Sequence, residues 1–360
     1  MALRMRLALL LISKSKDKRI LRVLLAIFWR GCAISTLAVT CVAHVQEQQP
    51  IVIAVFAPAT VSNVGCGFDV LGFALDAPGD VVIAAPIDRS GVEIASIDGD
   101  DGRLPRDVSR NTASTAAQAL LARLGTVQGV SLRIQKGMPV ASGIGSSGAS
   151  AVAAVVAVNE LLGRPASIEV LLDCAMAGEV AGCGSAHPDN VAPSLYGGFL
   201  LARSVSPLDL VPLPVPHELT CAVLHPHLEV ETSAARAVLG DRVPLRDAVR
   251  QWGNVGALVA SLFLNDLALL SRSIEDHIAE PKRAPLVPGL DAVKRAAHEA
   301  GALGSGLSGA GPSMFALCVG LERAQAAGEA MRGAYREASG HDADLWTSRV
   351  GGPGARVVSL

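Results

Sequence analysis

The segment Pro139–Ala151, which reads PVASGIGSSGASA, constrains the fold of this chain more than any other stretch. A glycine- and serine-rich turn runs here directly into a long apolar helix, expected over residues 149–162. Such a turn points several backbone N–H groups and the positive end of the helix dipole at one place, where an anion, usually a phosphate, binds. The serine hydroxyls can reach a phosphate oxygen or its magnesium. The sequence therefore predicts a phosphate site here and leaves the chemistry open.

The glycines of this turn also invite a second interpretation. Gly143, Gly145 and Gly148 satisfy the G-x-G-x-x-G pattern of dinucleotide-binding folds. That fold needs the turn early in a β-α-β unit and an acidic residue about 20 positions later, at a strand end. Glu160 and Glu169 are the candidates, and both fall within expected helices. The context therefore argues against a dinucleotide site. A P-loop is excluded too, because G-x-x-x-x-G-K-[ST] has no match.

Length and composition indicate a globular protein with two domains. The chain has 360 residues, 50% of them apolar, and a formal net charge of −2, so its charge gives no reason to expect nucleic-acid binding. Its seven cysteines form no C-x-x-C pair, which favours reduced thiols and the cytoplasm over a disulfide framework. His225 and His227 have no third ligand nearby, so a metal site there is disfavoured. Strand and helix patterns mixed beyond residue 50 predict an α+β fold, with a boundary near the proline-rich stretch 211–216.

The first 48 residues differ from the rest of the chain. They carry eight Lys or Arg residues against two acids, and arginines interrupt the longest apolar runs. No apolar span of about 20 residues is left for a transmembrane helix. A short apolar run followed by lysines also fits a signal peptide poorly. We expect residues 1–48 to be a dispensable or disordered extension, and an interfacial membrane anchor or a transit peptide is the alternative.

Two polar features follow the turn, a glutamate on an expected helix and a short polar turn after it. On the helix expected from Ile168, Glu179 lies on the same stripe as Leu172 and Ala175, so its carboxylate points inward. A buried carboxylate needs a partner such as Mg²⁺, which makes Glu179 a candidate magnesium ligand. The alternative is that Glu179 is only a glutamate at a fraying helix end. The turn His187-Pro-Asp-Asn190 brings polar side chains together. A turn explains Asp and Asn by itself, and a lone histidine is more often structural.

Two further glycine-rich loops are attached to expected strands, Ala57–Asp69 (APATVSNVGCGFD) and Gly301–Pro312 (GALGSGLSGAGP). Together with the turn at 139–151, they resemble in order and separation the three motifs of a family of small-molecule kinases. This family includes galactokinase, homoserine kinase, mevalonate kinase and phosphomevalonate kinase. Within it, the stretches PATVSNVGCGFDVLGFAL and HPDNVAPSLYGGF are similar to the homoserine kinase branch. The resemblance covers roughly residues 51–345.

The resemblance implies a two-lobed α+β fold. The N-terminal lobe, residues 49–210, would be like the second domain of ribosomal protein S5, and the C-terminal lobe, residues 211–360, would be ferredoxin-like. ATP would lie between the lobes with its phosphates over the glycine- and serine-rich turn. Mg²⁺ would be bound by Ser147 and Glu179. The nucleotide site that the resemblance implies consists of Pro139, Ser142, Gly143, Gly145, Ser146, Ser147, Gly148 and, near adenine, Asn111.

The same resemblance implies that L-homoserine is the acceptor, phosphorylated on its side-chain hydroxyl for threonine biosynthesis. Arg236 and Arg283 match the arginines that bind its carboxylate, and Asp69 matches the acid placed for its ammonium group. This charge balance suits an amino acid, because guanidinium is a planar, two-pronged donor to carboxylates. The polar lining would be formed by Asn63, His187, Asn190 and Thr232, with Asn190 at the reacting hydroxyl. Catalysis is expected from Asn190, Glu179, Ser147 and Arg236.

The mechanism expected from these residues does not need a strong base. Loose phosphoryl transfer depends mainly on positioning and on neutralising phosphate charge. Some relatives pair an aspartate base with a lysine of the first motif, but this chain has no lysine between Pro50 and Lys136. We therefore expect the γ-phosphate to take the hydroxyl proton, with Asp189 as the alternative base. We also expect a homodimer in the cytoplasm, with no nucleic-acid partner and no stable membrane insertion.

Other functions remain open at this stage. Another small alcohol could be the acceptor, although Asp69 together with two arginines favours an amino acid. A nucleotide-binding regulator that retains the fold is a second alternative. The joint presence of Ser147, Glu179 and Arg236 disfavours it, because a pure binder need not keep both metal ligands and substrate ligands.

Overall fold

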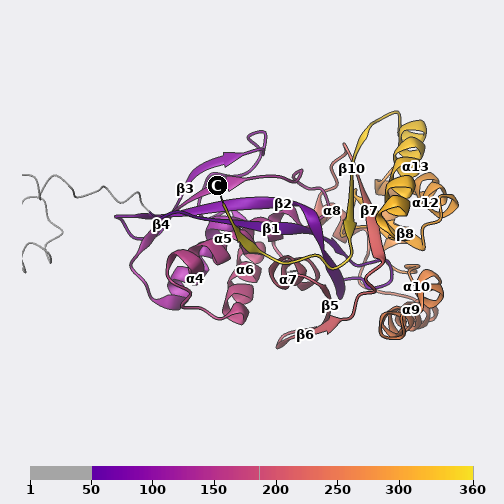
Figure 1. The fold of residues 1–360 in the computed structure, drawn as a ribbon, viewed down its shortest axis with the longest axis horizontal. Coiled ribbons are helices and arrows are strands. Elements are labelled where there is room, and N and C mark those ends of the chain that lie inside the picture. Colours follow the sequence, from indigo (N-terminus) through magenta and orange to yellow (C-terminus); the bar gives the residue numbers. More distant parts are fainter. Residues whose placement is uncertain (1–50, 186, 360) are drawn as a thin grey trace, which may run out of the picture. The chain divides into compact units, whose positions relative to one another are not determined.

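Two β-sheets organise the described part of the protein, which is seen here in a computed structural model (Figure 1). The structure describes residues 51–185 and 187–359, and of Cys183 and Thr232 it describes only the backbone. The extension expected at 1–48 therefore lies outside the described residues. The mixture of sheets and helices confirms the expected α+β fold. Among the described residues, no helix is both long enough and apolar enough to span a bilayer.

The first sheet has seven strands and contains the longest strand of the described chain, β2. Its main path runs in the order β11-β1-β2-β4-β3, and β5 pairs with β2 and with β6. One end of β2 pairs with β5 and the other with β4, so this strand connects both ends of the sheet. The strands are β1 (Ile53–Ser62), β2 (Leu71–Ile87), β3 (Val92–Asp98), β4 (Gly129–Gln135), β5 (Phe199–Val205), β6 (Leu208–Leu213) and β11 (Arg356–Val358).

Helix α5 (Ser146–Leu161) forms the centre of the first lobe, because it is apolar on nearly every side and must be covered on every side. Strands β1 and β2 contact it from the sheet. Helices α4 (Thr112–Leu124), α6 (Ile168–Cys183) and α7 (Pro188–Tyr196) also contact it and complete the layer beside the sheet (Figure 1). The glycine- and serine-rich turn ends at the N-terminus of this helix.

The second sheet is antiparallel, has the order β10-β7-β9-β8, and fits the ferredoxin-like expectation. Helix α13 packs on it together with α12, and their core includes the fully buried Met331 and Tyr335. The strands are β7 (Leu219–Pro226), β8 (Gly304–Leu307), β9 (Met314–Val319) and β10 (Ala343–Arg349). The helices of this lobe are α8 (Thr232–Ala237), α9 (Leu245–Leu264), α10 (Leu267–Ser271), α11 (Glu280–Arg283), α12 (Leu290–Glu299) and α13 (Leu321–Ser339), with a 3₁₀ turn at Ala284–Leu286.

The structure differs from the pattern-based expectation in two elements. The apolar run 51–56 predicts a strand that ends at residue 56, before the turn-rich segment 57–72, but β1 continues past Pro58 to Ser62. The apolar pattern of residues 267–278 predicts a single helix, but α10 ends at Ser271. The reason is Asp276, whose carboxylate accepts hydrogen bonds from the backbone N–H groups of Ile278 and Glu280 and so starts α11 instead.

The two lobes are not two continuous pieces of sequence. The expected boundary at 210/211 falls inside β6, which pairs with β5 in the first sheet. Near the C-terminus, β11 also joins the first sheet, where Ala54 faces Val358 across an antiparallel ladder. A cut at residue 210 would therefore separate paired strands at both ends of the second lobe.

Candidate active site

The glycine- and serine-rich turn connects β4 to α5 and can approach its neighbours only because it lacks side chains at two positions. Gly143 and Gly145 have φ angles of +79° and +73°, in the left-handed region. A Cβ on Gly143 would lie 2.5 Å from the carbonyl oxygen of Gly311, and one on Gly145 would lie 2.3 Å from Oγ1 of Thr60. The turn is thus wedged between β1 and the loop that follows β8. We call residues 140–147 the phosphate loop.

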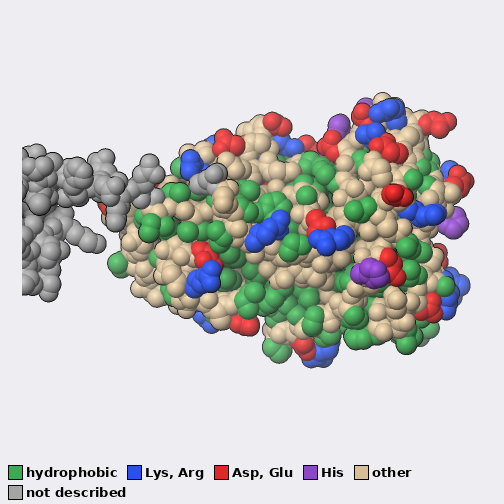
Figure 2. All heavy atoms as spheres, in the orientation of Figure 1, with side chains coloured by type: hydrophobic (Ala, Val, Ile, Leu, Met, Phe, Trp, Pro, Cys, Tyr) green, Lys and Arg blue, Asp and Glu red, His purple; other side chains and the backbone are tan. Residues whose placement is uncertain are grey.

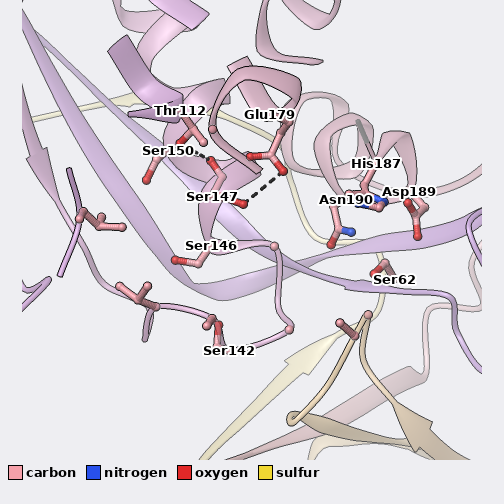
Figure 3. A pocket seen from close by; sticks show the side chains of 18 of the residues that line it. Ser62, Thr112, Ser142, Ser146, Ser147, Ser150, Glu179, His187, Asp189 and Asn190 are labelled. Carbon is pink, nitrogen blue, oxygen red and sulfur yellow. Dashed lines mark hydrogen bonds between the residues drawn. The ribbon is translucent and has the colours of Figure 1, made fainter. Parts of the chain in front are cut away.

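The phosphate loop forms one wall of a cavity of about 300 Å³. The first helical hydrogen bond of α5 runs from the Ala149 N–H to the Gly145 carbonyl, so the preceding N–H groups have no partner within the helix. Figure 3 shows Ser142, Ser146 and Ser147 along this wall. Unpaired amides and hydroxyls at a helix N-terminus provide the donors that an anionic phosphate needs.

Glu179 and Ser147 meet at the edge of the phosphate loop (Figure 3). The Ser147 hydroxyl donates to Oε2 of Glu179 over 3.2 Å, whereas Oε1 of this buried glutamate has no partner. Burial raises the pKa of Glu179 to about 7, against the smaller lowering effects of Ser147 and of the Lys136 charge. An orphaned, buried carboxylate oxygen beside a hydroxyl fits a cation. The described residues contain no cluster of three His, Cys, Asp or Glu side chains, so phosphate oxygens and water would complete its coordination.

A buried ion pair that we did not anticipate lies beneath the phosphate loop. The Lys136 ammonium contacts the Asp80 carboxylate and also donates to the Ser146 carbonyl (3.0 Å) and to the Ser150 hydroxyl (2.8 Å). Ser150 in turn donates to Asp80 over 2.6 Å, and the side chains of the ion pair are almost completely buried. The three groups therefore hold the first turn of α5 from below. The sequence signal was available, since Lys136 is the first lysine after residue 50 and directly precedes the turn.

The loop between β1 and β2 carries the first motif and is fixed by Asn63. Its side-chain amide donates to the Gly309 carbonyl over 2.8 Å, and its carbonyl oxygen accepts from the Asp69 N–H over 3.0 Å. Asn63 and Asp69 both have positive φ angles, 67° and 60°, which Asn and Asp tolerate better than other side chains. Asn63 therefore connects the first motif to the third, and it holds the backbone of Asp69.

The two expected carboxylate-binding arginines lie together over the same aromatic ring. The guanidinium carbons of Arg236 and Arg283 are 5.5 and 5.2 Å from the ring centroid of Phe68. Arg236 forms a salt bridge with Asp69, with a shortest distance of 2.8 Å. Arg283 is 4% exposed and donates to the carbonyls of Ala235 and Gly309 over 3.1 and 2.9 Å. Two cations and one anion are thus gathered on one side of the cavity.

Helix α7 begins with the polar turn and places His187, Asp189 and Asn190 next to one another (Figure 3). His187 interacts with the Ser185 hydroxyl over 2.7 Å, and burial lowers its pKa. Asp189 is buried with its Oδ1 unpartnered, and burial, followed by the charge of Asp69, raises its pKa to about 7. The Asn190 carbonyl oxygen accepts from the Thr60 hydroxyl over 3.0 Å. This turn is therefore the polar end of the cavity.

The third motif closes the cavity from the second lobe by bonding to the phosphate loop. The Ser308 hydroxyl donates to the Gly143 carbonyl over 2.8 Å, and the hydroxyl of Ser313, the residue after the motif, donates to the Ser142 carbonyl over 2.6 Å. These bonds turn the loop carbonyls outward toward the second lobe. The third motif acts here as a support of the phosphate loop, through groups that sequence reasoning did not single out.

Most of the expected site residues line this one cavity. They are Asn63, Asp69, Asn111, Ser142, Gly143, Gly145, Ser146, Ser147, Glu179, His187, Asn190, Arg236 and Arg283. Pro139 and Gly148 are not among its lining residues, and a side chain at Gly148 would meet Val191. Asn111 caps α4, accepting from the Ala113 N–H and donating to the Pro105 carbonyl, so its role at adenine stays a prediction. The side chain of Thr232 lies outside the described residues.

Comparisons with known proteins agree with this geometry. The GHMP kinases N terminal domain matches residues 111–198, and the GHMP kinases C terminal domain matches residues 257–337. A homoserine kinase of Chlorobium phaeovibrioides is 50% identical, over 84% of this chain and 98% of its own length. A homoserine kinase of Xylella fastidiosa is 40% identical, over 84% and 93%. The crystal structure of homoserine kinase from Cytophaga hutchinsonii superposes with a TM-score of 0.84 at 52% identity, covering 88% of this chain and 99% of that one.

The two domain matches, the homoserine kinase relatives and the two-sheet fold together show that the chain is a kinase of the GHMP family. More distant solved structures, such as L. major mevalonate kinase (TM-score 0.64, 17% identity), share the fold. Within the GHMP kinases, the chain belongs to the homoserine kinases, which it matches over nearly their entire length.

The buried pair beneath the phosphate loop leads to a prediction about stability. Lys136→Met leaves the Asp80 charge buried and unpaired, which should lower the free energy of unfolding by about 3–5 kcal/mol. The double variant Asp80→Asn/Lys136→Met removes both charges and should recover much of that loss. Both variants should raise KM for ATP, because the Ser146 carbonyl loses its donor. Urea unfolding and steady-state kinetics measure these effects. A double variant as unstable as Lys136→Met would contradict the ion-pair explanation.

Proposed function

We propose that this protein transfers the γ-phosphoryl group of ATP to the side-chain hydroxyl of L-homoserine, forming O-phospho-L-homoserine for threonine biosynthesis. The observation that carries this proposal is the composition of one cavity. An anion-binding loop forms one wall, and a cluster of two arginines with Asp69 forms another. Membership of the homoserine kinases supports the proposal, since the chain covers 98% of the length of its Chlorobium relative.

ATP is expected to bind with its phosphates on the phosphate loop. The unpaired N–H groups at the start of α5 would donate to phosphate oxygens, and the Ser142 and Ser146 hydroxyls lie on the same wall. Ser147 and Glu179 would hold Mg²⁺ through a hydroxyl and the orphaned carboxylate oxygen. When bound, Mg²⁺ would neutralise the charge that builds up on the phosphates during transfer.

The acceptor is expected to bind at the opposite end, where the charges match an amino acid. Arg236 and Arg283 would bind the α-carboxylate, and Asp69 would bind the α-ammonium group. Two N–H groups of Arg283 are already used on backbone carbonyls, so its remaining donors have a fixed direction. Asn63 and His187 line the same cavity, and Asn190, which also lines it, would contact the hydroxyl. Positioning of this kind accounts for a large part of the rate of phosphoryl transfer.

The chemical step forms a bond between the hydroxyl oxygen and the γ-phosphorus and breaks the bond to the β-phosphate oxygen, which releases ADP. We propose that the hydroxyl proton passes to the transferred phosphoryl group, because a loose transition state needs no strong base. Asp189 is the second candidate for the proton. Its buried carboxylate has an unpartnered oxygen and a pKa of about 7, which suits a general base.

The acceptor assignment is tested by ADP release from the purified protein. L-homoserine should give the highest kcat/KM, and L-serine, L-threonine and mevalonate should be poor acceptors. Mevalonate has a carboxylate but no ammonium group, so it cannot satisfy Asp69. Efficient turnover of mevalonate together with failure on homoserine would overturn the assignment.

Replacing Asp189 by Asn tests the proton path and has a pH-dependent effect on stability. Burial raises the carboxyl pKa from 3.8 to about 7, so the folded protein holds a proton that the unfolded chain has released. This group therefore costs stability as the pH rises from about 4 to about 7. Asp189→Asn cannot ionise, so it should melt higher than the wild type at pH 8 and at about the same temperature at pH 4.

The kinetics of the same variant separate the two proton acceptors. If the phosphoryl group takes the proton, kcat of Asp189→Asn at pH 8 should fall by less than about tenfold. A loss of several orders of magnitude would instead assign the base role to Asp189, since general bases contribute about 10²–10⁴-fold. Unchanged binding of ATP, measured by calorimetry, serves as the control for an intact cavity.

We also propose that the protein is a cytoplasmic homodimer. The buried free thiols of Cys66, Cys174, Cys221 and Cys318 support a reducing compartment. Helix α9 supports the dimer because it exposes a stripe of apolar side chains along one face, with Leu245 73%, Trp252 59% and Phe263 63% exposed. A Cβ on Gly256 would meet nothing within 4 Å, so the stripe is open to close approach. Run antiparallel, such a stripe fits a second copy of itself about a twofold axis.

The α9 interface makes a simple prediction. Trp252→Glu puts a charge in the middle of the exposed stripe and should shift the mass measured by light scattering from dimer to monomer. Arg246→Glu, which changes an exposed charge on the same helix outside the stripe, is the matched control and should leave the mass unchanged. A monomeric wild type, or a Trp252→Glu protein that stays dimeric, would contradict this interface.

A further inference from the structure

Asp69 and Arg236, which the proposed function assigns to opposite charges of the substrate, bond to each other. Arg236 Nη1 donates to Oδ1 of Asp69 over 3.0 Å, and Nη2 lies 2.8 Å from Oδ2, so the pairing is two-pronged. The two residues come from different lobes, Asp69 from the loop before β2 and Arg236 from α8. Both side chains line the cavity and are partly exposed, 35% for Asp69 and 48% for Arg236.

The surroundings hold both partners in place. Asp69 has a left-handed backbone conformation and its N–H is bonded by the Asn63 side chain. The Arg236 guanidinium lies over the Phe68 ring. Arg283 approaches the same ring and is anchored to two carbonyls, so it stays beside the pair as a second cation. A ligand that reaches either ion of the pair therefore meets an ion that already has a well-placed partner.

We infer that the Asp69–Arg236 ion pair selects zwitterionic acceptors by exchange of ion pairs. The inference rests on the proposed function, because it takes the acceptor to be an amino acid. The carboxylate of a zwitterion replaces Asp69 on Arg236, and its ammonium group replaces Arg236 on Asp69. The number of ion pairs is then greater after binding than before, and no ion is left alone. A ligand with only one charge separates the pair but leaves one protein ion without a partner.

Exchange of ion pairs can be distinguished by experiment from independent binding of the two substrate charges by Asp69 and Arg236. If Asp69 and Arg236 acted independently, removing one of them would not change the affinity for a ligand that uses only the other. With exchange, removing one partner releases the other from its bond. A singly charged ligand should then bind better to the variant than to the wild type, although the variant has lost a binding residue.

The experiment uses the two halves of homoserine. The deamino analogue 4-hydroxybutyrate carries only the carboxylate, and 3-amino-1-propanol carries only the ammonium group. Asp69→Asn should improve kcat/KM and affinity for 4-hydroxybutyrate about three- to tenfold, and Arg236→Gln should do the same for 3-amino-1-propanol. This range is what the loss of a competing, half-exposed ion pair allows. Both variants should lose activity on homoserine.

Glu231→Gln is the matched control for charge, since it removes an acid just before α8 without touching the pair. It should give no gain on 4-hydroxybutyrate, and a gain as large as that of Asp69→Asn would refute the exchange in favour of a general field effect. Singly charged ligands that bind the two pair variants no better than the wild type would also refute it.

Failure of the exchange and failure of the proposed function can be told apart. Affinities are measured by calorimetry with ATP present, and turnover is measured separately by ADP release. A wild type that phosphorylates homoserine while its variants show no gain refutes only the exchange. A wild type that does not phosphorylate homoserine, with variants that still gain affinity for the half-ligands, refutes the proposed acceptor and supports the exchange. The two variants test the exchange independently, so one that failed to fold would leave the other as the test.

Discussion

The active site depends on the close approach of three backbone segments at the phosphate loop. Glycine at 143 lets the loop touch the carbonyl of Gly311, and glycine at 145 lets it pass the Thr60 side chain on β1. Glycine has no Cβ that would clash at these two points. The loop carbonyls can therefore turn toward the second lobe, where the Ser308 and Ser313 hydroxyls donate to them. The amides at the start of α5 are left for a ligand, so the anion site is a consequence of this packing.

Charge compensation decides how the other polar groups are arranged around that loop. The deepest charges, Lys136 and Asp80, neutralise each other and hold α5 from below. Glu179 and Asp189 are buried without full partners, and both have pKa values raised to about 7. Incomplete pairing in a cavity leaves these groups available for a cation or a proton. On the outer surface drawn in Figure 2, by contrast, basic and acidic side chains are interspersed without gathering by sign.

Much of the candidate site was predictable because its chemistry is carried by short stretches of sequence. The turn before α5, the inward stripe position of Glu179 and the polar turn at 187–190 were all identified from local pattern, and all of them line the cavity. The prediction weakened where a residue's partner is remote. Lys136 was passed over, since its partner Asp80 is 56 residues away, although its ammonium donates to the Ser146 carbonyl beneath the loop.

The sequence by itself determined the phosphate loop, because glycine spacing and the apolar period of α5 are local properties that only a few backbone conformations satisfy. It also determined the family, through motifs whose residues are contiguous. Tertiary structure alone decided which charges meet. Arg236 is 167 residues from Asp69, and Lys136 is 56 residues from Asp80. Whether such groups pair depends on the register of the strands and on the packing of the lobes. A local sequence pattern does not indicate which residues that are far apart in the sequence come into contact.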